Sequence, residues 1–407
     1  MAAARLTMPR TWLGFLRSPR QWLVWAHRWV ALLAGLLLVL LGLTGSLMVW
    51  QAEIDRALNP AWFDAQPACN AATPAQPVAA TLAVLAQAAP QARAALVIAP
   101  VEAGAPFQVW EARDKRTGWR REHFIDARCA RYLGYRDRGA PRLDAAHAAP
   151  ALYELHTRLL LGENGHTVVG IAGLTLLGLA LSGVVASWPR RSTGTAWRRV
   201  FSVKRGAAPA RWWYDVHRAV GMWLLPLFLL MTATGTALVF SQEARALIGT
   251  ILPVTELPRM PRDKNNASAK AMLPVDELVA AANRRFPQAQ WSRLTLSGAD
   301  TGSFEVRLLQ PAEPRVDTGN TRVRLDARGQ VLAVHDPLSA PAGNRVLDWI
   351  FPLHSGEALG LIARLSWTLF GLAPALLFGS GTWLWWRRQR AMQRDSRVLA
   401  AAGAVAD

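Results

Sequence analysis

Cysteine is scarce in this sequence: Cys69 and Cys129 are the only two among 407 residues. Their spacing fits no metal-binding motif, and the lack of a Cys-x-x-Cys-His motif excludes covalent haem attachment. Both cysteines fall within residues 51–155. In an oxidising compartment they are expected to form a disulfide, which would close a loop of about 60 residues and stabilise the fold by about 3–4 kcal/mol through loop entropy. Two unpaired thiols are the alternative.

Charged residues are also few, at 18% of the chain against 52% hydrophobic residues, a balance typical of membrane proteins. Acidic residues are the scarcer kind, 28 against 46 Lys and Arg, so the formal net charge is +18. Such an excess can indicate nucleic-acid binding. Here, however, residues 1–28, 189–211 and 387–407 together carry +15, and each segment adjoins an apolar run. The distribution follows the positive-inside rule and argues against nucleic acid.

Four apolar segments are long enough to span a bilayer: residues 29–50, 167–188, 220–240 and 361–386. At about 1.5 Å per residue, each covers a hydrocarbon core of about 30 Å. Tryptophans gather at the ends of these segments, as in an aromatic belt. No small-residue cleavage site follows the first segment, which indicates an uncleaved signal anchor.

The basic segments then set the orientation, with both termini in the cytoplasm. The predicted organisation is a cytoplasmic N-terminus (1–28), a first span (29–50), an outer module (51–155), a second span with a preceding outer helix (156–188), a cytoplasmic loop (189–211), a third span (212–240), a second outer module (241–353), a fourth span (354–386) and a cytoplasmic tail (387–407).

Each outer module is predicted to be a small α+β unit with an amphipathic helix and a short antiparallel sheet. In the second module the helix is predicted at 275–286 and the strands at 291–296, 303–309, 322–326 and 331–335. In the first the helix is predicted at 81–89 and the strands at 95–98, 107–112 and 119–126.

Four histidines occupy matched positions in the two halves of the sequence: His27, His156, His217 and His354. The first and third each precede a Thr-Gly pair by 18 residues, and the other two each precede a span glycine by 27 residues. These repeats predict a four-helix transmembrane bundle made of two duplicated halves, related by an axis along the membrane normal.

The spacing of 18 residues equals five whole helical turns. Gly45 is therefore predicted on the helix face of His27, and Gly235 on the face of His217. Bare backbone on such a face would accommodate a bulky planar group, although close helix packing is an alternative explanation. The spacing of 27 residues after His156 and His354 does not show which helix face their glycines share, because intervening glycines indicate interrupted helices.

Two histidines from facing helices are the usual axial ligands of a b-type haem in a bundle. The predicted pairs are His27 with His217 at the inner face and His156 with His354 at the outer face. The arginines close enough in sequence to pair with haem propionates are Arg28, Arg218 and Arg364. For each histidine a polar anchor at the membrane interface is the alternative, and His166 competes with His156 as a ligand. The remaining histidines, His123, His147 and His335, are predicted on the surface of the outer modules.

Four motifs stand at the ends of the predicted spans, in a fixed order along the chain. They are His27-Arg-Trp29 before the first span, Leu155-His156 before the second, Pro352-Leu-His-Ser-Gly-Glu357 before the last, and Gly381-Thr-Trp-Leu-Trp-Trp-Arg-Arg388 at its end. Together they resemble the PepSY-associated transmembrane family, which includes iron-regulated inner-membrane proteins and ferric-siderophore reductases. The resemblance covers roughly residues 20–392.

This resemblance implies a bacterial inner-membrane protein with two periplasmic PepSY-like modules and two b-type haems. It implies one-electron transfer from a cytoplasmic or quinol donor to a ferric siderophore outside, in the service of iron uptake. The sequence contains no Gly-rich dinucleotide fingerprint, so a separate electron donor is expected. The alternative function is a non-enzymatic membrane protein whose modules bind a peptide, a partner or a metal chelate.

Overall fold

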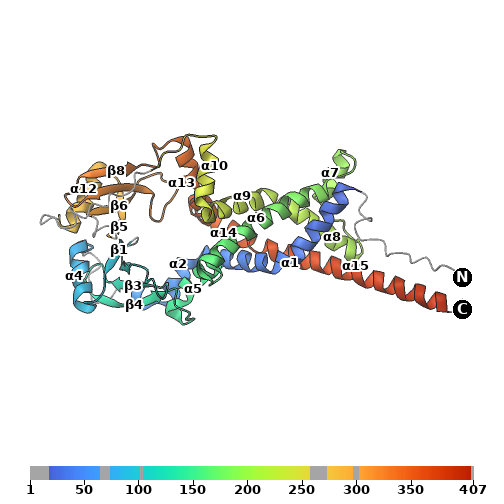
Figure 1. Ribbon diagram of the computed structural model, residues 1–407, viewed down its shortest axis with the longest axis horizontal. Coiled ribbons are helices and arrows are strands. Elements are labelled where there is room, and N and C mark those ends of the chain that lie inside the picture. Colours follow the sequence, from blue (N-terminus) through green and yellow to red (C-terminus); the bar gives the residue numbers. More distant parts are fainter. Residues whose placement is uncertain are drawn as a thin grey trace, which may run out of the picture. The chain divides into compact units, whose positions relative to one another are not determined.

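The structure is a computed structural model that describes residues 18–64, 74–100, 102, 104–256, 273–296 and 302–404, with side chains up to residue 394. The chain forms two compact units. The helical unit comprises Met1–Leu43, Ile171–Ala233 and Leu369–Asp407. The sheet unit comprises Thr44–Gly170 and Thr234–Thr368. Figure 1 labels most of the helices and strands of both.

Within these described ranges, three helical segments are long and apolar enough to cross a membrane. They are α1 (Pro19–Met48), α6 (Gly162–Ser187) and the stretch Glu357–Arg394, which contains η3 (Glu357–Leu359), α14 (Gly360–Phe370) and most of α15 (Ala373–Ala404). They lie where the sequence predicts the first, second and fourth spans.

The third predicted span is bent. It consists of α8 (Pro209–Trp223) and α9 (Leu225–Val239), which meet at 58°. Pro226 stands in the first turn of α9, and proline cannot continue a helix because it lacks an N–H and its ring clashes with the carbonyl four residues earlier. The predicted placement of Gly235 on the helix face of His217 assumes an unbroken helix and is therefore wrong, whereas α1 is continuous from His27 to Gly45.

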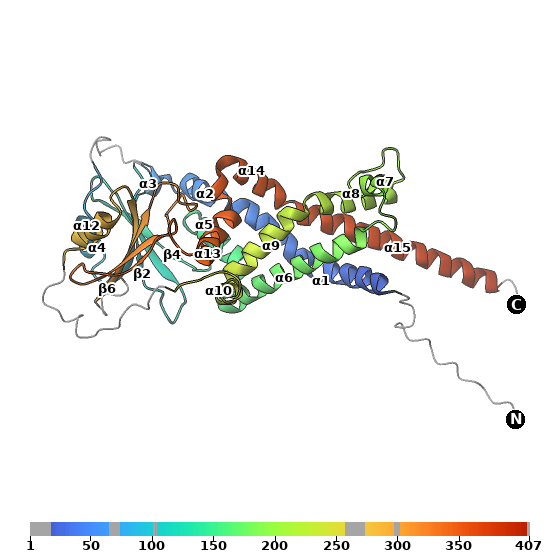
Figure 2. The ribbon, with the colours of Figure 1, turned by 90° about the horizontal axis from the view of Figure 1, so that it is seen from above.

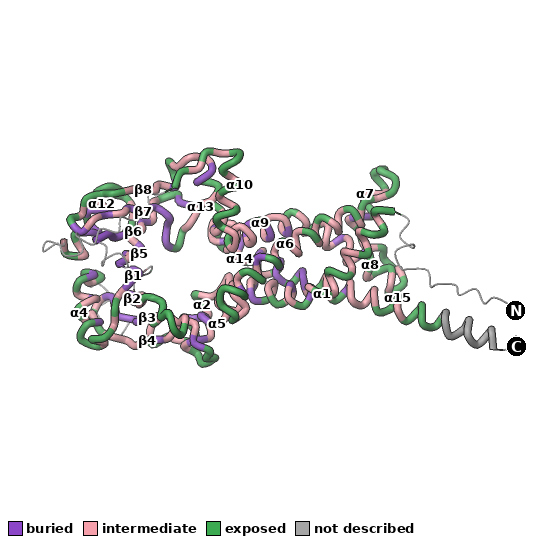
Figure 3. The backbone as a smooth tube through the Cα atoms, in the orientation of Figure 1, coloured by how far each residue is buried: buried purple, intermediate pink, exposed green. Residues whose placement is uncertain are grey.

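One face of α1 exposes apolar side chains at a helical spacing: Leu33, Leu36, Leu40, Leu43 and Leu47. Positions three and four residues apart share a helix face, so these leucines form a continuous apolar stripe. In Figure 3 exposed and intermediate residues predominate along α1 and α6, whereas buried residues concentrate in the sheet. Such a stripe suits contact with lipid tails rather than water.

The sheet unit contains one eight-stranded sheet in the order β4-β3-β2-β1-β5-β6-β7-β8. The strands are β1 (Ala94–Ile98), β2 (Phe107–Glu111), β3 (Arg120–Ile125), β4 (Tyr132–Arg138), β5 (Gln290–Thr295), β6 (Ser303–Leu309), β7 (Thr321–Asp326) and β8 (Val331–His335). The sequence predicts two modules but not their union, which comes from antiparallel pairing of β1 with β5 at Val97 and Leu294. It also misses β4, whose charged residues and glycine hide the alternation of a strand.

Helices α4 (Val78–Ala88) and α12 (Val275–Arg285) lie close together on one face of this sheet, as Figure 2 shows. The buried core lies beneath them and includes Leu85, Val97, Leu278, Leu294 and Phe304. The Asp276 carboxylate accepts hydrogen bonds from the backbone N–H groups of Val78 and Ala79 (2.7 and 3.0 Å). A residue of α12 thus caps the start of α4 and links the two sequence segments.

Short helices flank the sheet and the spans. They are α2 (Gln51–Leu58), α3 (Pro60–Phe63), α5 (Ala145–Arg158), α7 (Gly194–Val200), α10 (Ser241–Gly249) and α13 (Ala342–Ser355). His156 stands in the last turn of α5 and His354 in the last turn of α13. Gly356 ends α13 with φ 82°, a conformation that glycine adopts without strain. These helices are interrupted before the spans, as the sequence predicts.

Candidate functional site

Each of the four predicted histidines contacts a hydroxyl side chain on another helix. The Nδ1–Oγ distances are 2.8 Å for His27 and Ser182, 2.9 Å for His217 and Ser380, 2.9 Å for His156 and Thr44, and 3.1 Å for His354 and Thr234. In every case the residue after the hydroxyl is a glycine. Each histidine therefore lies against a hydroxyl–glycine pair, an arrangement found four times among the described residues.

The glycines of these pairs admit the imidazole rings at close range. A Cβ atom built on the glycine would lie 2.8 Å from His354 at Gly235, 3.1 Å from His156 at Gly45, 3.4 Å from His217 at Gly381 and 3.6 Å from His27 at Gly183, measured to Cε1. A side chain is thus excluded at Gly235, tight at Gly45 and tolerable at the other two positions. The sequence pattern identified these glycines but did not predict the contact between hydroxyl and histidine. The Ser or Thr before each glycine is the signal that could have indicated it.

The hydrogen bonds of Ser182 favour one tautomer of His27. When the Ser182 hydroxyl donates to the Leu179 carbonyl (3.1 Å), its oxygen is left to accept from Nδ1–H of His27. The Ser380 hydroxyl likewise donates to Leu377 and accepts from His217. Both imidazoles therefore carry a lone pair on Nε2, the atom through which a histidine held in this way binds a metal.

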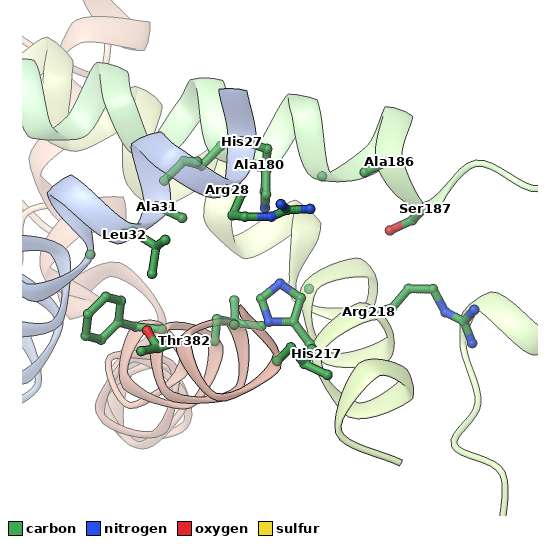
Figure 4. Close-up of a pocket in the computed structure, with 18 of the residues that line it drawn as sticks. His27, Arg28, Ala31, Leu32, Ala180, Ala186, Ser187, His217, Arg218 and Thr382 are labelled. Atoms are coloured by element: carbon green, nitrogen blue, oxygen red, sulfur yellow. The ribbon is translucent and has the colours of Figure 1, made fainter. Parts of the chain in front are cut away.

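His27 and His217 line one cavity of about 490 Å³ in the helical unit. In Figure 4 the two side chains enter it from different helices, α1 and α8, with Thr382 of α15 nearby. Much of the remaining lining is apolar and includes Leu32, Leu38, Leu176, Phe228 and Phe378. Its size and its few convergent polar groups suit a cofactor or small ligand. The structure thus brings together the pair that the sequence predicts.

Three arginines line the same cavity: Arg28, Arg218 and Arg388. Arg218 is already engaged, because it donates to buried Asp215 (2.9 Å) and to the Arg199 carbonyl. Among the residues that the structure describes, no carboxylate lies within 4.0 Å of Arg28 or Arg388. Arg388, which the sequence prediction missed, therefore joins Arg28 as a cation available to an anionic group.

Two further polar atoms of α15 in this cavity are buried and make no hydrogen bond in the described part of the chain. They are Thr382 Oγ1 and Trp385 Nε1. A buried donor without a partner is costly. Together with the two cations, these atoms fit a large, mostly apolar ligand that carries anionic groups.

In the sheet unit, His156 and His354 keep the same contacts with Thr44 and Thr234. His156, rather than its competitor His166, shares the hydroxyl–glycine contact of the other three histidines. Arg364 donates to the Val49 carbonyl (2.8 Å), pairs with Glu53 and lies over the Trp50 ring. Its predicted role with a propionate stays a prediction.

The surface location predicted for the other histidines is wrong for two of them. His123 is 1% exposed and lies between Tyr132 and Glu111, and His147 is 5% exposed and contacts Asp144. Both are held as structural hydrogen-bonding residues. His335 is partly buried.

The disulfide prediction concerns Cys129 and Cys69. Cys129 is disulfide-bonded, and the chain has one other cysteine. Cys69 itself lies outside the described residues.

Two comparisons place the chain among known proteins. Residues 24–388 match the family described as PepSY-associated TM region. The uncharacterized protein PA4219 of Pseudomonas aeruginosa is 30% identical over 279 residues. That alignment covers 62% of this chain and 66% of the relative, just under two thirds of its length.

Proposed function

Because the chain belongs to the PepSY-associated transmembrane family and is therefore a membrane protein, we propose that it is a haem-dependent electron-transfer protein. The proposed reaction is the one-electron reduction of a ferric chelate. Fe(II) binds oxygen-rich chelators much less well than Fe(III), so reduction releases the iron. A b-type haem with two axial histidines supplies one-electron transfer without an open coordination position.

The observation that carries this proposal is the paired arrangement of His27 and His217 in the helical unit. Each imidazole donates Nδ1–H to a serine that is itself held by a helix carbonyl, so each keeps Nε2 available for iron. Such partners orient a ligand and increase its basicity. Arg28 and Arg388 would bind the propionates, and the apolar lining would exclude water from the macrocycle.

The matching contacts of His156 and His354 support a second haem. His217 follows His27 by 190 residues, and Thr234 follows Thr44 by the same number; His354 follows His156 by 198 residues, as Ser380 follows Ser182. The same two histidine–hydroxyl contacts therefore occur in each half of the chain, between helices of that half. This supports a duplicated chain in which each half supplies one histidine of each pair.

The orientation proposed for the protein follows its basic segments. The termini and residues 189–211 would lie in the cytoplasm, and the eight-stranded sheet on the outer side of a bacterial inner membrane. The electron donor would then be a separate cytoplasmic or quinol molecule, and the ferric chelate would be reduced outside, in iron uptake.

Haem content of the purified protein tests this proposal. From haem-replete cells we expect about two b-type haems per chain with a spectrum of two axial histidines. His27→Ala and His217→Ala should each lower the content to about one. His166→Ala is the matched control, since it removes a histidine of α6 that lacks the hydroxyl–glycine contact, and it should retain both. Folded protein without colour would overturn the proposal.

A further inference from the structure

Three arginines oppose one another directly across the central and C-terminal strands of the sheet. Arg293 on β5 pairs with Arg307 on β6, and Arg307 pairs with Arg322 on β7. Their neighbours Leu294, Val306 and Val323 are fully buried in the core beneath α4 and α12. Side chains alternate between the faces of a strand, so the arginines lie on the opposite face.

Like charges directly opposite each other destabilise a sheet. Within the described residues, no carboxylate lies within 4.0 Å of any of these three guanidiniums, and Arg293 Nε is buried without a hydrogen-bond partner. Burial, followed by the charges of Arg322 and Arg293, lowers the pKa of Arg307 to about 9. The row therefore stays cationic at neutral pH while its members repel one another.

Two of the nearby acidic residues are engaged elsewhere. Asp348 of α13 accepts from His335 (3.0 Å) and from Asn320 (2.6 Å). Glu305 pairs with Arg324 (2.8 Å), two register positions from the row and on the same face of the sheet. Glu305 and Asp348 attract Arg322, and Asp317 and Glu357 attract Arg293, but none of these carboxylates lies within 4.0 Å of the row. Arg322 also donates to Asn320 Oδ1 (2.8 Å).

Other arginines add to the positive charge around the row. Burial and then the charge of Arg315 lower the pKa of Arg293, and Arg138 on β4 contributes in the same direction. Arg138 belongs to the first four strands and Arg293 to the last four, so both sequence segments contribute. Arg315 itself lies over the Phe351 ring and has Asp317 at 3.4 Å.

We propose that Arg293, Arg307 and Arg322 form a binding site for a soluble, multiply charged oxyanion, of the carboxylate or phosphate class. Guanidinium groups bind such oxygens through paired, charge-assisted hydrogen bonds. A ligand with two or more negative charges would replace the mutual repulsion by attraction. The site does not depend on haem; only the choice of an anionic ferric chelate as its natural ligand rests on the proposed function.

The test uses the full-length protein in a neutral detergent with citrate and gallium(III) citrate as probes, since neither can be reduced at the site. We expect saturable binding that weakens as salt rises, together with an increase in melting temperature. Arg307→Gln should weaken binding by at least about tenfold, the effect of losing one charge-assisted pair. It should also raise the melting temperature of the ligand-free protein, because it relieves repulsion rather than removing a stabilising contact.

The matched control is Arg121→Gln, which removes the same charge from the same sheet. Arg121 on β3 lies on the face of the sheet opposite to the row and pairs with Asp137 (2.8 Å). The Arg121→Gln variant should bind both probes as the unmodified protein does. Equal binding by Arg307→Gln, or no binding by the unmodified protein at low salt, would overturn the inference.

A second arm separates a soluble anion from a lipid headgroup. The titration is repeated in nanodiscs of phosphatidylcholine and of phosphatidylglycerol. The proposal requires equal citrate affinity in both. If citrate binding is lost only with phosphatidylglycerol, the headgroup occupies the row and the soluble ligand is rejected. Haem content, measured on the same samples, reports separately on the proposed electron transfer.

Discussion

At the scale of single residues, the hydroxyl of the hydroxyl–glycine pair favours one tautomer of the imidazole. Ser182 and Ser380 each donate to a carbonyl of their own helix, which leaves their oxygen to accept from the histidine. The glycine that follows lets the ring approach the helix. The pair thereby favours one tautomer and fixes the position of the ring.

Replacing Ser182 with Ala should weaken haem retention, because His27 loses its hydrogen bond to the Ser182 hydroxyl. Loss of such a partner typically costs about 10–100-fold in metal affinity. Haem transfer to apomyoglobin provides the measurement. Thr175→Ala is the control: its hydroxyl also bonds a carbonyl of α6, that of Ile171 at 2.8 Å, but it is exposed. Equal retention in both variants would contradict the role of Ser182.

The four glycines should differ in their tolerance of alanine. Gly235→Ala places a methyl 2.8 Å from His354, whereas Gly183→Ala places one 3.6 Å from His27. The first should therefore displace its histidine and the second should not. Haem content and the optical spectrum of each variant measure this, and a spectrum of Gly235→Ala identical to that of the unmodified protein would count against the contact.

At the scale of elements, a buried ion cluster attaches α2 to the sheet. Arg136 of β4 is 3% exposed and donates to Asp55 of α2 (2.7 and 2.8 Å) and to Glu122 of β3 (2.6 Å). Its pKa is raised, since the charges and hydrogen bonds of these carboxylates outweigh burial. Each member satisfies another, so the cluster depends on all three.

Arg136→Met should be strongly destabilising, because it leaves two carboxylates buried without a cation. Breaking a buried pair in this way costs about 3–5 kcal/mol. Thermal unfolding of the purified protein measures the loss. Adding Asp55→Asn and Glu122→Gln should recover part of it. Arg121→Met, at the exposed pair with Asp137, should cost about 1 kcal/mol or less.

At the scale of the whole molecule, the arginine row makes stability depend on pH. The folded-state pKa of Arg307 is about 9, below its ordinary value of 12.5. Between these values the unfolded chain binds more protons, so stability rises with pH through that window. Below about pH 9 the repulsion is present in full.

Arg307→Gln lacks this charge at every pH. Its advantage in melting temperature over the unmodified protein should therefore be largest near pH 8 and should shrink towards pH 10.5. Differential scanning measurements across this range, with both proteins in the same detergent, would detect the change. A constant difference would show that Arg307 does not titrate as described.

Much of the fold could be predicted because it depends on local pattern. Period-two alternation located β5 to β8 within one residue at each boundary, and apolar length located α1 and α6. The bend between α8 and α9 was also encoded locally, by Pro226, but the matched spacing of His217 and Gly235 favoured an unbroken helix. The pairing of β1 with β5 could not be predicted, because either strand could equally have remained an edge.

The sequence by itself determined which residue types stand at which repeat positions: four histidines, each matched by its counterpart 190 or 198 residues later, and the Ser-Gly and Thr-Gly pairs within the spans. The tertiary structure decided which of these meet. His27 contacts Ser182, 155 positions away, and Arg293 meets Arg307 across a strand register. Such contacts arise when helices and strands pack, and packing joins positions whose separation along the chain carries no information about their distance in space.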